Sequence, residues 1–450
     1  MALPKETLLS SLTSNQEEHI SLLQQFIQTP SPNPPGDTTT AAKTLTTYLS
    51  SKGIPYKILT APGHPEKTNI VSEFTGGAGP GPRVVLNGHI DHFPVDESTI
   101  AKWDRDPYSG EISNSRIYGR GAVDMKSGTC SLLIAYAALY SQRESLKGSV
   151  VFSGVSDEET GGAFGTRYLI HQNRDKWGGD LMLSAEPSGQ TIRFSEKGTL
   201  RVRGVVRTRG AHGAYLNLRS IPYIPYNIGC VVNISVLVAS KGAIRTAAHF
   251  LSNITSAIEA IPPCPPPEIA AYLADQTVLD AVDAAMGPRT SSIIALPTVN
   301  IGTIAGGIKV NMIPDSCTFE LDIRLPVGLV AETVLEVIAA EINSGRYPDA
   351  SIEISTQQAA SNPASVSPLT HPVISALKKN AALLNGGTKP VVIPSMGATD
   401  CKHYRYAGVP AYVYGCSPLT MASVNESASV DEFLHVAKVH ALATWDFLTE

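Results

Sequence analysis

Residues 83–94 read RVVLNGHIDHFP, and this stretch decides how the rest of the chain is interpreted. Its first half is a continuous apolar run, as expected of a strand that is buried on both faces. Two later runs, SVVFSGV at 149–155 and LMLS at 181–184, have the same character, and an Ala- and Leu-rich segment at 128–140 predicts a helix. This alternation is typical of an α/β protein whose open sheet is flanked by helices.

The pattern changes after residue 196, where strand-like segments begin to alternate between apolar and polar residues. Such alternation predicts strands with one face in solvent. Two strands, an amphipathic helix and a further strand are expected at 199–207, 316–325, 330–342 and 351–355. These elements predict a smaller α+β domain.

The chain then returns to the first pattern, with a helix expected at 372–384 and a strand within 409–415. We therefore expect a first domain formed by residues 1–196 and 363–450, with residues 197–362 inserted between its two parts. A chain of 450 residues is long enough for two cores, which supports this division.

Composition excludes several classes of function. The formal net charge is -5, the isoelectric point is about 6.1 and there is no basic tract, so neither nucleic acid nor an anionic membrane is expected as a partner. No run approaches the ~18 consecutive apolar residues that a membrane span needs. The N-terminus predicts an amphipathic helix rather than a leader, and the six cysteines are scattered without CxxC pairs. A cytoplasmic protein with reduced thiols is expected.

Two polar clusters follow apolar segments. In an extended segment His89 and Asp91 share a face and can point into one site, where a carboxylate would orient a metal-binding imidazole. A polar turn at a strand end is the alternative interpretation. Asp124 lies within GRGAVDMKSG at 119–128, at the mouth of the predicted helix, where it could bind a ligand or cap the helix.

Two further clusters consist of carboxylates. Consecutive acids at 157–159 end one strand and repel each other unless a cation lies between them, although a solvated acidic loop is the alternative. Glu186, in the sequence Ala-Glu-Pro, ends another strand. Ligands of open α/β sheets bind at the carboxyl ends of the strands. One histidine and three carboxylates there predict a site for zinc or a similar divalent ion.

Taken together, these motifs resemble those of a known family. HIDHFP, GRGAVDMKSG, DEETGG and AEP occur in the order found in the zinc metallopeptidases and deacylases that include acetylornithine deacetylase, succinyl-diaminopimelate desuccinylase, aminoacylase and glutamate carboxypeptidase. The resemblance runs from PSPNPPGD near residue 30 to the C-terminal helix. It implies a zinc-exopeptidase-like sheet domain with an inserted lid and dimerisation domain.

The resemblance also implies roles for the site residues. His89 and Glu186 are similar to the ligands of a first metal, Asp124 to the carboxylate that bridges two metals, and Glu159 to a ligand of the second. Glu158 is similar to the general base.

Other residues resemble the family's orienting and substrate-binding positions. Asp91 is similar to the partner that orients the histidine ligand, and His212 to the histidine that reaches the partner subunit's site and stabilises an oxyanion. Asn311, Arg324 and Gly397 match positions beside the substrate, where Arg324 could hold a carboxylate. A turn histidine and an exposed strand arginine are the plain alternatives for His212 and Arg324.

One departure from the family pattern affects the second metal. The family usually has a histidine three residues before Asn-Glu or Asp-Glu, and here that position is Ala422. An alanine introduced in place of a ligand would give the same sequence. A catalytic zinc usually has three protein ligands, so one Zn²⁺ is expected and two are possible, with Co²⁺ or Mn²⁺ as substitutes. His92 and His403 are the candidates to fill the gap.

These observations predict a hydrolase: a zinc-dependent amidohydrolase that cleaves an N-acyl amino acid or small peptide and forms a homodimer through the inserted domain. Two alternatives stay open within the fold. One is a metalloenzyme that forms or rearranges an amide in a specialised metabolite, and the other is a catalytically impaired binding protein. A nucleotide-binding protein is disfavoured, because no Gly-rich phosphate loop follows the first strand.

Overall fold

The computed structural model describes residues 4–213 and 241–449, which divide into two compact units. The second unit comprises Lys197–Ala271 and Ser291–Ala364, and the remaining residues form the first unit. The expected insert was continuous, whereas Tyr272–Thr290 belongs to the first unit. Tyr272 donates a hydrogen bond of 2.7 Å to the carbonyl of Val392, which fixes this segment there.

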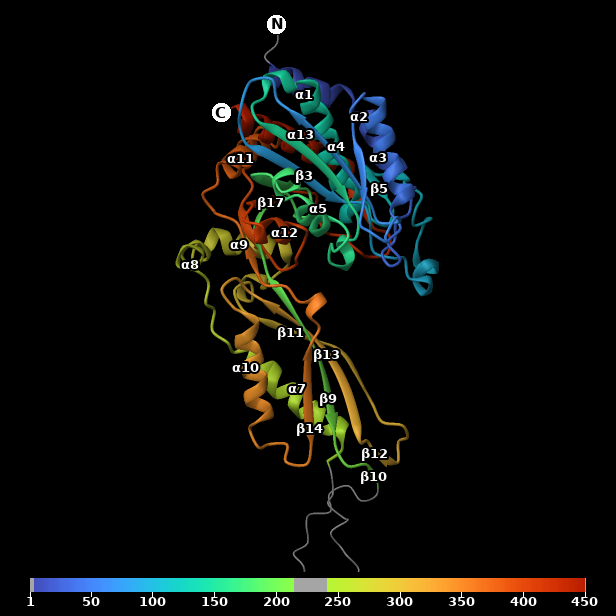
Figure 1. Ribbon diagram of the computed structural model, residues 1–450, viewed down its shortest axis with the longest axis vertical. Coiled ribbons are helices and arrows are strands. Elements are labelled where there is room, and N and C mark those ends of the chain that lie inside the picture. The colour runs from blue at the N-terminus through green and yellow to red at the C-terminus, as the bar shows by residue number, and fades with distance from the viewer. Residues whose placement is uncertain (1–3, 214–240, 450) are drawn as a thin grey trace, which may run out of the picture. The chain divides into compact units, whose positions relative to one another are not determined.

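A nine-stranded mixed sheet forms the centre of the first unit (Figure 1). The strand order is β1-β2-β6-β3-β7-β17-β8-β15, with β16 also paired to β8. The four middle strands β6, β3, β7 and β17 are parallel, so their carboxyl ends lie along the same edge. The strands are β1 (Lys57–Thr60), β2 (Thr68–Thr75), β3 (Arg83–His89), β6 (Ser149–Val155), β7 (Leu181–Ser184), β8 (Ile192–Glu196), β15 (Ser365–Val366), β16 (Val392–Ser395) and β17 (Ala411–Val413).

Helices cover this sheet because its middle strands are apolar on both faces. Val85 and Met182 belong to a core cluster with Leu169 of α5 and Tyr404 of α12. Helix α4 packs on β3 and β6, and α13 packs on α4. The helices of this unit are α1 (Pro4–Ser14), α2 (Gln16–Ile27), α3 (Thr39–Ser51), α4 (Ser127–Ser141), α5 (Thr166–Gln172), α6 (Arg174–Trp177), α9 (Gln276–Met286), α11 (Pro372–Leu384), α12 (Cys401–Tyr406) and α13 (Val430–Thr449). A small sheet of β4 (Ile112–Ser113), β5 (Arg116–Tyr118) and β18 (Ser427–Ser429) completes it.

The second unit is built on a four-stranded antiparallel sheet of order β11-β13-β9-β14. Buried and half-buried residues alternate along β13, and its buried residues pack with α7 and α10 in one core. The elements are β9 (Gly198–Arg207), α7 (Ala243–Glu259), β11 (Thr298–Gly306), β13 (Ser316–Leu325), α10 (Ala331–Ile342) and β14 (Ser351–Thr356), with a separate pair β10 (Ala211–His212) and β12 (Met312–Ile313). Helix α8 (Pro267–Leu273) spans the boundary between the units.

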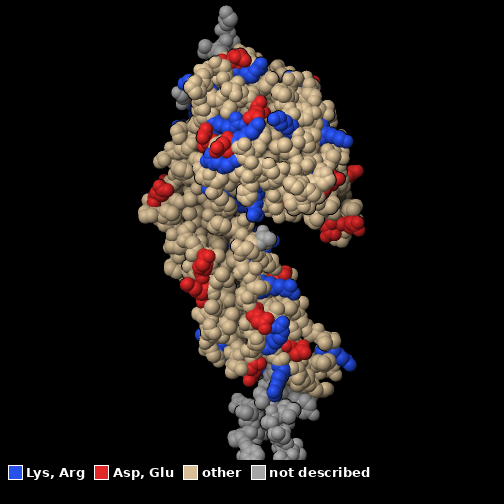
Figure 2. Space-filling view, viewed as in Figure 1, with Lys and Arg blue, Asp and Glu red and all other residues tan. Residues whose placement is uncertain are grey.

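The expected fold class is confirmed: a large mixed sheet flanked by helices, together with a smaller α+β unit. Acidic and basic side chains are interspersed on the face shown in Figure 2, as a small net charge allows. Among residues 4–213 and 241–449, no helix combines the length and apolar character needed to cross a membrane.

Candidate metal centre

Neighbouring strand ends and one helix start bring the predicted metal ligands together. His89 is the last residue of β3, and Glu186 follows β7 by two residues. Asp124 lies in the turn before α4, where its φ and ψ of -115° and 99° interrupt the helical path. Because β3 and β7 are adjacent and parallel, the side chains that follow them are delivered to one edge of the sheet.

The trio of His89, Asp124 and Glu186 has the geometry of a metal site. His89 Nε2 lies 3.2 Å from Asp124 Oδ1 and 3.7 Å from Glu186 Oε1. One potential ligand atom from each residue lies within 4.8 Å of the other two. An imidazole nitrogen and two carboxylate oxygens are a typical ligand set for zinc and related divalent ions.

The charges of the trio also fit a cation. Burial and then the neighbouring carboxylates raise the pKa of Glu186 well above its usual value, although His89 opposes this. Burial lowers the proton affinity of His89, but Glu186, Asp124 and Asp91 raise the pKa of His89 well above its usual value. The site therefore has an excess of buried negative charge, which a divalent ion would neutralise.

Asp91 orients His89 through its main chain. His89 Nδ1 lies 2.8 Å from the Asp91 carbonyl oxygen, so a proton on Nδ1 leaves Nε2 free to act as a ligand. The Asp91 carboxylate is 3.7 Å from Nδ1 and instead accepts hydrogen bonds from the main-chain N–H groups of Glu158 and Glu159, at 3.3 and 3.2 Å. Asp91 thus connects His89 to the acidic loop after β6.

Glu426 holds the turn that carries Asp124. Glu426 Oε1 accepts hydrogen bonds from the main-chain N–H groups of Val123 and Asp124, at 2.9 and 3.3 Å. Its other oxygen pairs with Arg120 at 2.7 Å, and both side chains are buried. The Asn-Glu end of the C-terminal motif therefore has a structural contact that does not depend on the residue at position 422.

Glu158 is a carboxylate beside the trio whose side chain is 11% exposed. Burial raises the pKa of Glu158 to about 7, Asp124 contributes to the rise, and Lys402 and His89 oppose it. Lys402 Nζ lies 3.8 Å from Glu158 Oε1, and Lys402 is itself buried. Such a carboxylate can exchange a proton near neutral pH, as a general base requires.

Glu159 also approaches Asp124 but lacks a full ligand set. Burial and then Asp124 raise the pKa of Glu159 to about 10. Among the described residues, Glu159 Oε1 is buried and has no hydrogen-bond partner. Ala422 is exposed, with a left-handed φ of 57°, and its methyl group cannot be a ligand. Asp124 and Glu159 alone supply fewer donors than a zinc site normally has.

The two candidate histidines have other partners. His92 Nε2 accepts the main-chain N–H of Ser31 at 3.0 Å, and its Nδ1 lies 2.7 Å from the Phe93 carbonyl oxygen. His403 Nε2 lies 3.2 Å from the carbonyl oxygen of Gly161. In this structure, neither histidine completes a ligand set with Asp124 and Glu159.

Three predicted site residues lie in the second unit. His212 in β10 pairs with Met312 of β12, and Asn311 accepts a main-chain hydrogen bond of 2.8 Å from Gly213, so His212 and Asn311 are near neighbours. Arg324 in β13 is paired with Asp322 through Nη2 at 2.9 Å, and its other N–H groups could still donate to a substrate carboxylate.

Gly397 lies in the first unit, on an exposed part of the loop between β16 and α12. A Cβ atom there would meet nothing within 4 Å, so packing does not require a glycine at this position.

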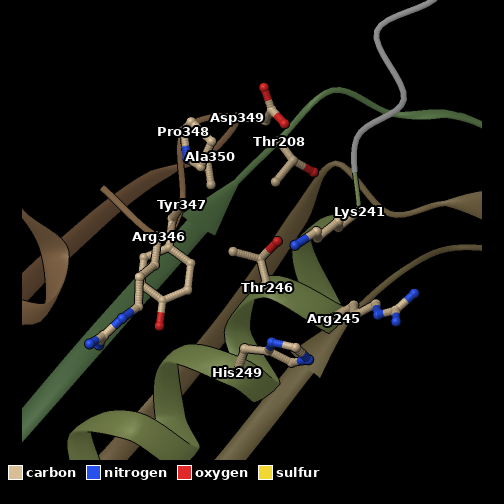
Figure 3. A pocket seen from close by; sticks show the side chains of 10 residues that line it. All are labelled: Thr208, Lys241, Arg245, Thr246, His249, Arg346, Tyr347, Pro348, Asp349 and Ala350. Carbon is tan, nitrogen blue, oxygen red and sulfur yellow. The ribbon is translucent and has the colours of Figure 1, made fainter. Parts of the chain in front are cut away.

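A pocket of about 70 Å³ in the second unit is lined by Thr246 and His249 of α7 and by Tyr347 and Ala350 from the segment after α10 (Figure 3). It contains none of the predicted site residues. We therefore do not assign it to the metal centre.

Four residues that support the site were not predicted: Asn33, Arg120, Lys402 and Glu426. Asn33 lies within PSPNPPGD and Glu426 within the C-terminal motif, so both belong to stretches that carry the family resemblance. Their partners lie far away in the sequence, 58 residues for the contact of Asn33 with Asp91 and 303 residues for the contact of Glu426 with Val123. A local sequence pattern does not predict contacts between such distant residues.

Comparison with known proteins agrees with this geometry. Residues 85–446 match the profile of the peptidase family M20/M25/M40. The chain is 25% identical over 441 residues to succinyl-diaminopimelate desuccinylase from Ehrlichia canis (strain Jake), covering 94% of this chain and 96% of that protein.

Two crystal structures share the fold. Human carnosine dipeptidase 1 has a TM-score of 0.72 at 16% identity, with 100% of both chains covered. An M20 family metallo-carboxypeptidase from Sulfolobus solfataricus has a TM-score of 0.69 at 19% identity, covering 95% of this chain and 99% of that one. The family match spans most of the chain and includes the trio. The chain therefore belongs to peptidase family M20/M25/M40 and is a hydrolytic enzyme.

Proposed function

We propose that this chain is a metal-dependent amidohydrolase that cleaves the amide bond of an N-acyl amino acid or a small peptide. The observation that carries the proposal is the largely buried carboxylate of Glu158 beside the trio of His89, Asp124 and Glu186. The desuccinylase and dipeptidase activities named for the similar proteins support an amide substrate.

The trio would hold the ion, which we propose is Zn²⁺, with Co²⁺ or Mn²⁺ as expected substitutes. When bound, the ion supplies Lewis-acid chemistry that polarises the amide carbonyl and increases the acidity of water. Glu158 accepts the proton of the attacking water and returns it to the leaving amine. His212 of the partner subunit donates a hydrogen bond to the developing oxyanion, and Asn311, Arg324 and Gly397 bind the substrate.

The metal content follows from the donors present. The trio supplies three donors, whereas Asp124 and Glu159 lack the third donor at Ala422. We propose one firmly bound ion per chain, with a second bound weakly if at all.

We further propose a homodimer formed through the second unit, which would act as lid and dimerisation domain. Strand β11 lies at the end of the described strand order, and Ile301 and Ile304 on it are 43% and 50% exposed. An edge strand with exposed apolar residues is available for pairing with another chain. Light scattering after size exclusion should give about twice the chain mass.

The proposed compartment is the cytoplasm. Within the described residues, all five cysteines are free: Cys130, Cys264, Cys317, Cys401 and Cys416. Unpaired thiols of this kind are usual in a reducing compartment. Cys230 lies outside the described residues.

Glu158→Gln tests the proposed reaction. Hydrolysis of a panel of N-acyl amino acids and dipeptides, with both products quantified, should fall about 100- to 10,000-fold, because general acid–base catalysis contributes that much. The metal content should not change. Glu144→Gln, on an exposed side chain, is the matched control and should keep full activity. Turnover of Glu158→Gln within a few-fold of wild type would refute the assignment.

A further inference from the structure

Asn33 joins two parts of the catalytic site that come from different strands. Its side chain is buried, and its Nδ2 donates to Asp91 Oδ2 at 2.7 Å and to Thr160 Oγ1 at 3.1 Å. Asp157 Oδ1 lies at the limit of hydrogen bonding, 3.5 Å away. One carboxamide thus connects Asp91, just after β3, with the acidic loop after β6.

The Asp91 carboxylate extends this connection to the proposed general base. Its two oxygens accept the main-chain N–H groups of Glu158 and Glu159 in addition to the Asn33 amide. The same residue holds His89 through its carbonyl oxygen. A shift of the Asp91 carboxylate would therefore move the main chain of Glu158 relative to the histidine ligand.

Asn33 is itself held in place by main-chain contacts. Its N–H donates to the carbonyl of His92 at 2.9 Å, and the Ser31 hydroxyl donates to the carbonyl of Ile90 at 2.7 Å. These contacts run along the segment that follows His89. Asn33 therefore moves with the ligand-bearing strand and can transmit its position to the acidic loop.

Lys67 makes a second contact with the acidic loop. Lys67 Nζ lies 3.4 Å from Asp157 Oδ1 and donates to the carbonyl of Pro35 at 3.0 Å. Asp157 in turn accepts the Thr160 hydroxyl at 2.6 Å. Asn33 and Lys67 thus both approach Asp157 Oδ1, at 3.5 and 3.4 Å, and Asn33 also donates to Thr160 of the same loop.

We propose that Asn33 is a positioning residue of the hydrolytic reaction, which fixes the carboxylate of Glu158 relative to His89 through Asp91 and Thr160. This inference rests on the proposed function of Glu158. Asn33 has no direct part in proton transfer. Its amide N–H groups bridge the Asp91 carboxylate and the Thr160 hydroxyl. Without this bridge the two acceptors would move apart or bind water instead.

Two substitutions test this role. Asn33→Asp keeps the shape but places a third carboxylate beside Asp91 and Asp157, and Asn33→Ala removes the amide. Both should lower kcat about 100-fold, because a displacement of about 1 Å at a reacting group has that effect, while KM stays within about threefold. Metal bound by the trio should be retained, as measured by elemental analysis.

Asn380→Asp is the matched control for stability. Asn380 lies in α11 and is also buried, and its Nδ2 donates to Asp446 of α13 at 3.0 Å. Neither residue belongs to the trio or to the acidic loop. The substitution therefore imposes a similar loss of stability, and kcat should stay within about twofold of wild type.

The outcomes separate the two proposals. If wild type hydrolyses amides and Glu158→Gln is inactive, but both Asn33 variants keep kcat within about twofold of Asn380→Asp, the positioning role is refuted and the proposed function stands. If Glu158→Gln keeps wild-type turnover, the proposed function is refuted, and the inference about Asn33 with it. Selective loss of kcat in the Asn33 variants supports both.

Discussion

The two sides of Asp124 differ in how far they are equipped to hold a cation. On the trio side, His89 and Glu186 approach Asp124, and the orientation of His89 is fixed by the carbonyl of Asp91. On the other side, called here the Glu159 side, Glu159 has a buried oxygen without a partner, and the third position is the exposed Ala422. One shared carboxylate thus serves a complete donor set and an incomplete one.

This difference shows that a motif can keep one of its contacts and lose another. Ala422 offers no donor, yet Glu426 in the same loop binds the main chain of Asp124 and pairs with Arg120. The loop therefore still shapes the trio side. We expect the metal centre to depend strongly on the trio and weakly on the Glu159 side.

Removing a ligand from the trio should have the largest effect. His89→Ala, or the near-isosteric Glu186→Gln, should abolish firmly bound metal and lower hydrolysis by roughly 1,000-fold, because Lewis-acid stabilisation is worth several kcal/mol. Elemental analysis after dialysis and a hydrolysis assay measure both effects. The control is His403→Asn, which removes a partly buried histidine outside the trio. Equal metal loss in His403→Asn would show that metal binding does not depend specifically on the trio.

Glu426→Gln should have the next largest effect, because it weakens the support of Asp124 without removing a ligand. The charged pair with Arg120 is lost, while an amide oxygen can still accept the main-chain N–H groups. Loss of such supporting contacts typically lowers metal affinity about 10- to 100-fold. Competition with a chelator should reveal the change. Glu432→Gln, which alters a main-chain contact to Ser417 in the same C-terminal region, should leave the affinity unchanged.

The sequence predicted much of this fold because the decisive strands are short, apolar and bounded by polar turns. β3, β6, β7, β9, β13 and β14 occur within about two residues of their expected positions, and so do α4, α10 and α11. Helix α7 was missed. It contains several Thr, Ser, His and Asn residues with modest helix propensity, and packing of Phe250 and Ile254 against the sheet stabilises it.

Strand β11 was missed for a related reason. Its sequence, TVNIGTIAG, contains two glycines, and most of its residues are exposed, so it shows no alternation of buried and exposed positions. Its place is fixed by the antiparallel pairing of eight of its residues with β13 rather than by a local pattern.

The candidate site divides in the same way. His89, Asp124 and Glu186 could be brought together from the rule that ligands bind at the carboxyl ends of strands. The contacts of Asn33, Lys402 and Glu426 could not, because each depends on how distant segments pack. The orientation of His89 by the Asp91 carbonyl rather than the carboxylate likewise depends on the main-chain conformation of the segment after β3, which the sequence pattern does not specify.

Ala422→His should sharpen the comparison by supplying the missing donor. The left-handed conformation of Ala422 is one in which histidine is enriched, so the substitution should be tolerated. Bound metal should rise from about one to about two ions per chain, with three donors then available on the Glu159 side. Ser423→His, one residue further on, is the matched control and should bind no additional metal. An unchanged metal content in Ala422→His would show that the loop does not bring position 422 to Glu159.

The smallest expected effect is on the pH dependence of stability, and it comes from His92 and His403, which do not supply the missing ligand on the Glu159 side. Burial lowers the pKa of His92 to about 3 and, together with Lys402, lowers the pKa of His403 to about 3, against 6.5 for an ordinary histidine. The unfolded chain therefore binds more protons than the folded chain between these values, and the free energy of unfolding falls as pH decreases from 6.5. Each such histidine contributes a slope of about 1.4 kcal/mol per pH unit.

His403→Asn should remove one of these contributions. Denaturant unfolding between about pH 6 and pH 4 should then show a slope about 1.4 kcal/mol per pH unit smaller than in wild type, under the same metal conditions. His249→Asn, at an exposed histidine of the second unit, provides the control, and its slope should equal that of wild type. A slope in His403→Asn equal to that of wild type would mean that His403 binds its proton over the same pH range in the folded and unfolded chains, and is therefore mostly protonated below about pH 6. A protonated imidazole could not be a metal ligand, so even that result would leave the Glu159 side without a third donor at this pH.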